Sequence, residues 1–162
     1  MAHDQSEVQA AVEAYIAVRD RISAGEGTWG ELAQFFTDDV VYIDPAWGRL
    51  EGIEAIRSEL LGEAMAGLDD WTFPTDLFLI DGDTVLVKWR QEFPGQDGRR
   101  RSQSGYSTLV YGGGGKFRYE EDLLNMAHVI EDIVASGWQP PDGAPFPMPP
   151  ADPNRDFTIP EA

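Results

Sequence analysis

The stretch Val40–Gly52 reads VVYIDPAWGRLEG and decides how the rest of the chain is interpreted. Its first four residues favour a β-strand, because β-branched and aromatic side chains are typical of strands. Pro45 has no backbone N–H, so the strand is expected to end at Asp44, and the glycine at the end of the stretch opens a helix. A carboxylate at a strand end, beside Tyr42 and Trp47, is suited to proton chemistry in an apolar pocket. The alternative is that Asp44 caps a turn or a helix.

Composition narrows the class of protein. The chain has 162 residues, a mass of 18.0 kDa and a net charge of −17, which indicates one domain with a solvated acidic surface. This charge argues against nucleic acid or an anionic membrane as a partner. The absence of cysteine excludes disulfides, thiolate metal sites and a cysteine nucleophile. With no apolar run of about 20 residues and a polar N-terminus, we expect a soluble, cytoplasmic protein.

Apolar periodicity predicts helices and strands in a definite order. The predicted helices are Ser6–Ser23, Trp29–Phe36, Ile53–Met65 and Met126–Ser136, and the predicted strands are Val40–Asp44, Trp71–Ile80, Thr84–Phe93, Arg99–Tyr111 and Lys116–Leu123. Asp81–Gly82–Asp83 is a strong hairpin signal, and Gly112–Gly115 predicts a looser hairpin turn. This order indicates an α+β design in which a largely antiparallel sheet folds around helices and leaves a cavity between them.

The C-terminal end differs in composition from the rest of the chain. From Gln139 onward eight prolines fall within a short acidic segment, which cannot build a core of its own. We therefore expect a domain over residues 1–138 and a Pro-rich tail over 139–162, either disordered or laid extended across the domain. Aromatic residues in the tail favour some docking.

Three segments carry a resemblance to a known superfamily: AVEAYIAVRD (11–20), FFTDDVVYIDPAWGRLEGIEAIR (35–57) and TLVYGGGGKFRYEED (108–122). With the order of elements, they resemble the NTF2-like superfamily of ketosteroid isomerase and SnoaL-like polyketide cyclases over about Val8–Leu124. The resemblance implies an NTF2-like cone, in which a curved mixed sheet wraps around N-terminal helices, and a homodimer. Members include isomerases, cyclases, dehydratases, epoxide hydrolases and proteins that only bind.

The resemblance also implies site residues. Asp44 falls where ketosteroid isomerase has its general base, and Tyr15 falls where that enzyme has its oxyanion-hole tyrosine. Ser107 stands where the family's protonated aspartic acid is expected, which departs from the isomerase pattern. Family cyclases place an acid/base aspartate on the last strand, so Asp122, with Glu120, is the expected second acid. The alternative makes these residues a solvated strand end beside the N-terminus of the last helix.

The alternation of side chains along a strand predicts which residues of the sheet face the cavity. On the final strand it puts Arg118, Glu120, Asp122 and Leu124 toward the cavity, and Tyr119 and Glu121 away from it. The predicted substrate-binding residues are Tyr42, Trp47, Val87, Trp89, Gln91, Ser107 and Leu109, although residues of this kind are also typical of plain core. The same parity could place Arg101 at the cavity rim, with a solvated hairpin as the alternative.

No cofactor or metal is expected. His3 and His128 are distant in sequence and have no acidic residue at a fixed spacing. The sequence thus predicts a cofactor-independent acid/base enzyme for a small hydrophobic carbonyl or epoxide compound. In this reading Asp44 is the base, Tyr15 the oxyanion donor, and Asp122 or Glu120 the second acid. The alternative is a non-catalytic binding or dimerisation module on the same fold.

Overall fold

The first helix forms because apolar residues recur at helical spacing near the N-terminus. The computed structural model describes residues 3–161, beginning with α1 (Gln5–Ser23). The side chain of Asp4 caps this helix by accepting a hydrogen bond from the Ser6 backbone N–H at 2.8 Å. The apolar face of α1, which includes Tyr15, is buried against the sheet.

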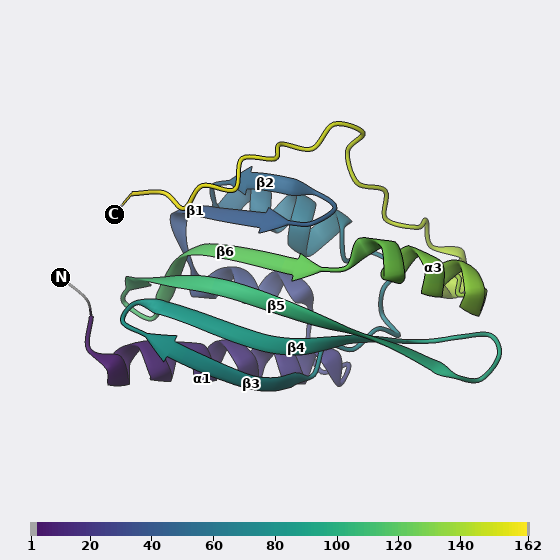
Figure 1. The fold of residues 1–162 in the computed structure, drawn as a ribbon, viewed down its shortest axis with the longest axis horizontal. Helices are drawn as coiled ribbons and strands as arrows, with labels where there is room; N and C mark the ends of the chain where they lie inside the picture. Colours follow the sequence, from purple (N-terminus) through teal and green to yellow (C-terminus); the bar gives the residue numbers. More distant parts are fainter. Residues whose placement is uncertain (1–2, 162) are drawn as a thin grey trace.

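Within residues 3–161, six strands form one curved, open sheet in the order β2-β1-β6-β5-β4-β3 (Figure 1). They are β1 (Phe36–Asp44), β2 (Gly48–Glu51), β3 (Thr75–Asp81), β4 (Thr84–Pro94), β5 (Arg100–Gly113) and β6 (Lys116–Leu124). The pairing of β1 with β6 is parallel, and the other four pairings are antiparallel. The expected mixed sheet of an α+β fold is therefore confirmed.

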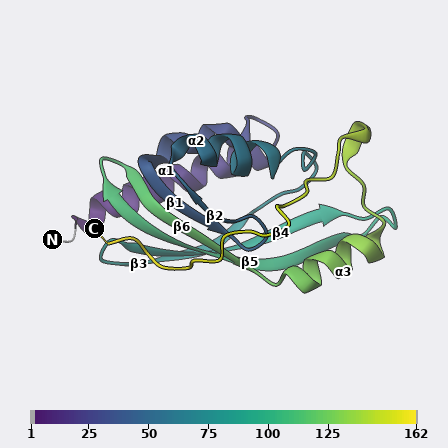
Figure 2. The same ribbon diagram turned by 90° about the horizontal axis from the view of Figure 1, so that it is seen from above.

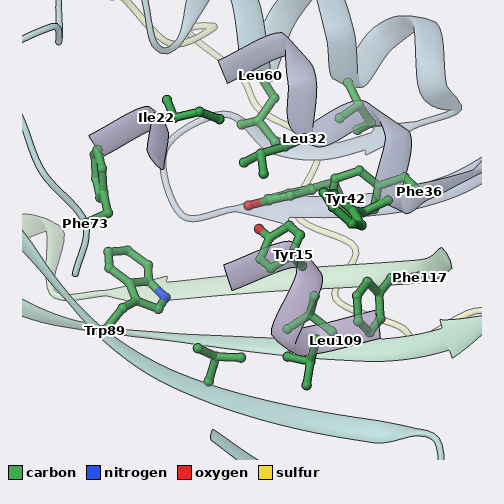
Figure 3. Close-up of a cluster of buried hydrophobic side chains, with 14 of the residues drawn as sticks. Tyr15, Ile22, Leu32, Phe36, Tyr42, Leu60, Phe73, Trp89, Leu109 and Phe117 are labelled. Carbon is green, nitrogen blue, oxygen red and sulfur yellow. The ribbon is translucent and has the colours of Figure 1, made fainter. Parts of the chain in front are cut away.

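The helices gather on one face of the sheet. α1, the 3₁₀ helix η1 (Trp29–Phe35), α2 (Ile53–Ala55) and the π-helical turn η2 (Ile56–Glu63) pack there, and α3 (Met126–Ser136) lies at the far end beside the long β4–β5 hairpin (Figure 2). A last 3₁₀ turn, η3, spans Pro141–Gly143. The shared core contains aromatic side chains from both layers, such as Tyr15, Phe36 and Phe117, which meet edge to face (Figure 3).

Several strand boundaries differ from the predicted ones for identifiable reasons. Within Trp71–Ile80, Pro74 was expected to interrupt the strand or to place it at an edge, and β3 indeed begins at Thr75 and lies at the edge of the sheet, with only an isolated bridge from Thr72 to Glu92 before it. β1 begins at Phe36 and not at the predicted Val40, so residues 37–39, which lie between the predicted helix and strand, belong to the strand. β2 was not predicted, since a four-residue edge strand leaves little periodicity to detect.

A β-bulge in β6 corrects the predicted parity of that strand. Val110 pairs with Tyr119 and Tyr111 pairs with Phe117, so Arg118 is an extra residue on β6. Phe117 packs against Tyr15 in the main core, whereas Tyr119 packs on the opposite face of the sheet. Arg118 is therefore absent from the cavity lining, contrary to expectation, and its Nη1 donates to the Pro160 carbonyl at 2.7 Å.

The Pro-rich tail leaves α3, crosses to the β2 edge of the sheet and lies extended along it (Figures 1 and 2). The Arg49 backbone N–H donates to the Asn154 carbonyl at 2.8 Å, and the Arg49 side chain donates to the Thr158 carbonyl at 2.8 Å. Gly48 has a φ of 79°, and a Cβ on it would lie 2.5 Å from the Asn154 carbonyl oxygen. The β1–β2 hairpin thus needs a glycine at position 48, where the tail crosses it.

Gly105 sets the position of Trp89, its cross-strand partner. A Cβ at this glycine would lie 2.5 Å from the Trp89 ring, so Gly105→Ala must displace the indole. We expect it to lower the free energy of unfolding by about 1–3 kcal/mol and to change the tryptophan fluorescence. Gly30→Ala is the matched control, because no atom lies within 4 Å of the position that its methyl group would take. Equal stability of the two variants in urea titrations would contradict this packing.

Candidate functional site

A cavity of about 530 Å³ lies between the helices and the sheet. Its size is within the range of small-molecule sites, roughly 300–1,000 Å³. Apolar side chains from η2, α3 and the loop before β3 form most of the wall, and tail residues Phe146–Ala151 close part of it. The Pro-rich tail therefore contributes directly to the cavity.

Two acidic residues of β6 stand on the helix side of the sheet. Glu120 is 1% exposed, and both of its carboxylate oxygens lie 3.1 Å from the Tyr15 hydroxyl, which donates to them. Asp122 lines the cavity, accepts a hydrogen bond from the Tyr42 hydroxyl at 2.7 Å and a second from the Ser107 hydroxyl. The hydroxyl ends of Tyr15 and Tyr42 point to the same region in Figure 3.

Burial disfavours the ionised form of both carboxyl groups. Desolvation, followed by repulsion from Asp122, raises the pKa of Glu120 to about 8. Desolvation likewise raises the pKa of Asp122, against the opposing attraction of Arg19 and the hydrogen bond from Ser107. Desolvation also raises the pKa of Tyr15 and Tyr42, so both tyrosines remain neutral donors at physiological pH.

Asp44 lines the same cavity at the end of β1. One of its oxygens, Oδ1, accepts hydrogen bonds from the backbone N–H groups of Ala46 and Trp47 at 2.7 and 2.8 Å. The other oxygen makes no hydrogen bond to a residue within 3–161. Desolvation raises the pKa of Asp44 to about 6, although the Trp47 N–H opposes the shift. Asp44 is thus both a turn-capping carboxylate, as the structural alternative expected, and a cavity residue with one free oxygen.

Arg19 is a cavity residue that was not predicted from the sequence. It lies one turn after Tyr15 on α1, is 5% exposed, and stacks over the Trp89 ring at 4.8 Å from the ring centre. Its Nη1 is buried and has no hydrogen-bond partner among the described residues. The detectable signal was an arginine within the apolar face of a helix, which is rarely buried without a partner or a function.

The structure divides the predicted substrate-binding residues into two groups. Tyr42, Trp47, Trp89 and Gln91 line the cavity, whereas Val87 and Leu109 are completely buried in the core and Ser107 reaches the site through its hydrogen bonds to Asp122 and Trp89. Val87 and Leu109 have the predicted facing, but helix side chains cover them. Arg101 pairs with Asp97 at 2.9 Å and does not line the cavity, and His128 is exposed on α3.

Residues 3–161 contain neither a cluster of metal ligands nor a long apolar helix. No group of three or more histidine, aspartate or glutamate side chains in this range is arranged to hold a metal ion. No helix in the same range has the length and apolarity needed to cross a membrane.

The raised pKa of Glu120 predicts a pH-dependent stability. Between about pH 5 and 8 the folded protein keeps a proton that the unfolded chain releases, so Glu120 makes stability fall as the pH rises through this window. Glu120→Gln cannot titrate and is expected to gain on the order of a few kcal/mol relative to wild type between pH 5 and pH 8. Urea denaturation across this range measures the difference.

The matched control is Glu121→Gln, because the neighbouring Glu121 side chain hydrogen-bonds Tyr119 on the opposite face of the sheet. It should keep the wild-type pH dependence. A Glu120→Gln variant with the wild-type slope would show that Glu120 is not the group responsible.

Comparisons with known proteins find the same fold in several solved structures. A structure from Jannaschia sp. CCS1, described as a candidate SnoaL-like polyketide cyclase, matches with 15% identity and a TM-score of 0.66, covering 83% of this chain and 98% of that one. TerC co-crystallised with polyporic acid matches with 20% identity and a TM-score of 0.58, covering 77% and 96%. An NTF2-like protein of unknown function from Burkholderia pseudomallei K96243 matches with 13% identity and a TM-score of 0.61, covering 77% and 95%.

At these identities the structural matches show the fold. A search of curated proteins finds no match. The model of the SnoaL-like domain family matches residues 12–119, which run from within α1 into β6 and include β1 to β5. The chain therefore belongs to the SnoaL-like domain family and has the NTF2-like fold.

Proposed function

We propose that the protein is a cofactor-independent acid/base enzyme that acts on a small hydrophobic carbonyl or epoxide compound. The observation that carries the proposal is that two carboxyl groups, Asp44 and Asp122, line one largely apolar cavity. Both have a raised pKa because they are desolvated. General acids and bases work best when their pKa lies near the working pH.

The hydrogen bonds of the two carboxylates suggest different roles. Asp44 holds one oxygen on backbone N–H groups and has its second oxygen free, as a positioned general base requires. Asp122 accepts from Tyr42 and Ser107 and serves as the second acid. In this scheme Asp44 takes a proton from the carbon beside a carbonyl. The electron pair of that C–H bond forms a C=C bond to the carbonyl carbon, and the π pair of the C=O bond moves to the oxygen, where Asp122 supplies a proton. Return of a proton at another carbon completes an isomerisation.

Tyr15 does not have the free hydroxyl expected of an oxyanion donor, because it is bonded to Glu120. We assign Tyr15 instead as a positioning residue. Its hydrogen bonds to Glu120 fix that buried carboxyl group on the same strand as Asp122. Similar structures described as candidate polyketide cyclases, or crystallised with polyporic acid, are compatible with an organic ligand in this type of fold. They share the fold at 15–20% identity.

The alternative is a binding module that uses the same cavity without catalysis. The backbone hydrogen bonds of Asp44 favour it, since they would exist in a purely structural turn. The free Asp44 oxygen, which faces the cavity, favours the enzyme.

Proton exchange distinguishes the two functions. In D₂O the wild-type protein is expected to accelerate deuterium incorporation beside the carbonyl of 2-tetralone, followed by proton NMR. The rate should rise with pH through about 6, where Asp44 loses its proton to become the base. Asp44→Asn should lower the rate by roughly 10²- to 10⁴-fold. Asp39→Asn, at an exposed position of the same strand, is the control.

A wild-type rate equal to that of Asp44→Asn would reject proton abstraction by Asp44. If 2-tetralone also bound in the cavity without exchange, the binding module would be the better description.

We further propose that the protein is a homodimer that buries the outer face of the sheet. Large apolar side chains lie exposed there on neighbouring strands: Leu77 and Leu79 of β3, Leu86 of β4, Tyr106 of β5 and Leu123 of β6. The pairs Leu79–Leu86 and Tyr106–Leu123 face each other across strands. Exposed apolar clusters of this kind are typical of interfaces.

Sedimentation equilibrium tests the dimer. Wild type should sediment at twice the chain mass, and Leu79→Lys should shift it toward the monomer, because a buried unpaired charge opposes association. Val134→Lys, on the 76%-exposed position of α3, is the control. A wild-type monomer at all concentrations would reject the proposal.

A further inference from the structure

Three buried N–H groups around the cavity have no hydrogen-bond partner among the described residues. They are Nη1 of Arg19, Nε2 of Gln91 and Nε1 of Trp71, and all three residues line the cavity. Each is at most 7% exposed. Buried donors are almost always paired, because an unpaired one costs on the order of 1–3 kcal/mol. Three such donors in one cavity point to a ligand that supplies the missing acceptors.

The three donors belong to one region of the sheet. Arg19 lies over the Trp89 ring, Gln91 is the next inward-facing residue of β4, and Trp71 stacks on the one after it, Phe93, at 4.4 Å. Successive inward-facing residues of a strand are about 6–7 Å apart. The three donors therefore lie at successive positions beside β4, although Arg19 comes from a helix, Gln91 from the strand itself and Trp71 from a loop.

Gln91 and Trp71 lie away from the acidic end of the cavity, whereas Arg19 lies between the two ends and attracts Asp122 and Glu120. Asp122 pairs with Ser107 on β5, and Ser107 pairs with Val87 on β4. Gln91 lies four residues farther along β4 than Val87. That corresponds to about 13 Å along the sheet. A ligand can therefore present one oxygen to the donor group while a different atom meets the carboxyl groups.

Charge identifies the preferred ligand. The Arg19 guanidinium makes no direct ion pair with any described carboxylate, so its charge is balanced only by the Trp89 ring and by attraction at longer range to Asp122 and Glu120. Arg155 of the tail lines the same cavity, so both cationic side chains of the lining are available to an anion in a protein of net charge −17. Guanidinium groups bind carboxylates in a two-pronged geometry.

We infer that the cavity binds a hydrophobic carboxylic acid, whose carboxylate is held by Arg19 and Gln91 with Trp71 as a further donor. Its flat apolar body would lie against the aromatic wall and reach toward Asp44 and Asp122. The inference rests on the proposed function, because it names the substrate class of the same site. It assigns Arg19 and Trp71 as specificity-determining residues.

Binding of a matched anion and ester tests this inference. The probes are 2-naphthoate and the neutral methyl 2-naphthoate, measured by calorimetric titration. Wild type is expected to bind the carboxylate roughly 10-fold or more tightly than the ester. Arg19→Gln should weaken 2-naphthoate by roughly 10- to 100-fold and change the ester less than about threefold.

Further variants separate this role from a structural one. Gln91→Glu places a carboxylate beside Arg19 and should abolish 2-naphthoate binding while the ester still binds. Arg155→Gln, at the exposed rim, should cost less than Arg19→Gln. Equal loss of both probes in Arg19→Gln, or no wild-type preference for the carboxylate, would overturn the inference.

The outcome is independent of catalysis. Arg19-dependent binding of 2-naphthoate without deuterium exchange of 2-tetralone would support the inference and reject the proposed enzyme. Exchange without any preference for the carboxylate would do the reverse.

Discussion

The parallel pairing of β1 with β6 is the constraint on which the site depends. In this register Tyr42 pairs with Glu120 and Ile43 with Glu121, so the next residues on the two strands are Asp44 and Asp122. Parallel neighbours in register point to the same face and lie about 5 Å apart along the sheet's hydrogen-bonding direction. The bulge at Arg118 sets which face this is. Without the extra residue, either Phe117 or Glu120 would leave the helix side.

The helix layer buries these acidic residues and supplies one of their hydrogen-bond donors. α1 covers the β1–β6 pair and brings the Tyr15 hydroxyl to Glu120, while hydroxyl groups of Tyr42 and Ser107 bond Asp122. The hydrogen bonds from these neutral donors do not outweigh burial, so desolvation remains the largest influence on each pKa. Arg19 is the nearby cation, and it too is buried. Such a concentration of buried polar groups destabilises the fold locally, which is typical of functional sites rather than of structural cores.

Much of the fold and part of the candidate site could be predicted because they follow from local patterns. The strand ending at Asp44, the hairpin at Gly82 and the amphipathic α1 depend on Pro45, a glycine with positive φ and helical periodicity, respectively. The sequence could not predict that Trp89 lines the cavity while Val87 is buried in the core. Both face inward on β4, and only the helix side chains packed above them decide which borders a cavity. The role of Arg19 was missed because periodicity assigns a residue to a face but says nothing of its partners.

By itself, the sequence determined the class of fold, the order of elements and the presence of acidic residues on strands that face a helix layer. Strand and helix periodicity are local properties, and the amino acids alone carry them. The tertiary structure decided that Asp44 and Asp122 share one cavity, that Tyr15 is engaged by Glu120, that Arg118 leaves the cavity for the tail, and that the Pro-rich tail forms part of the wall. These outcomes depend on long-range register, one bulge and side-chain packing, which join residues up to about a hundred positions apart.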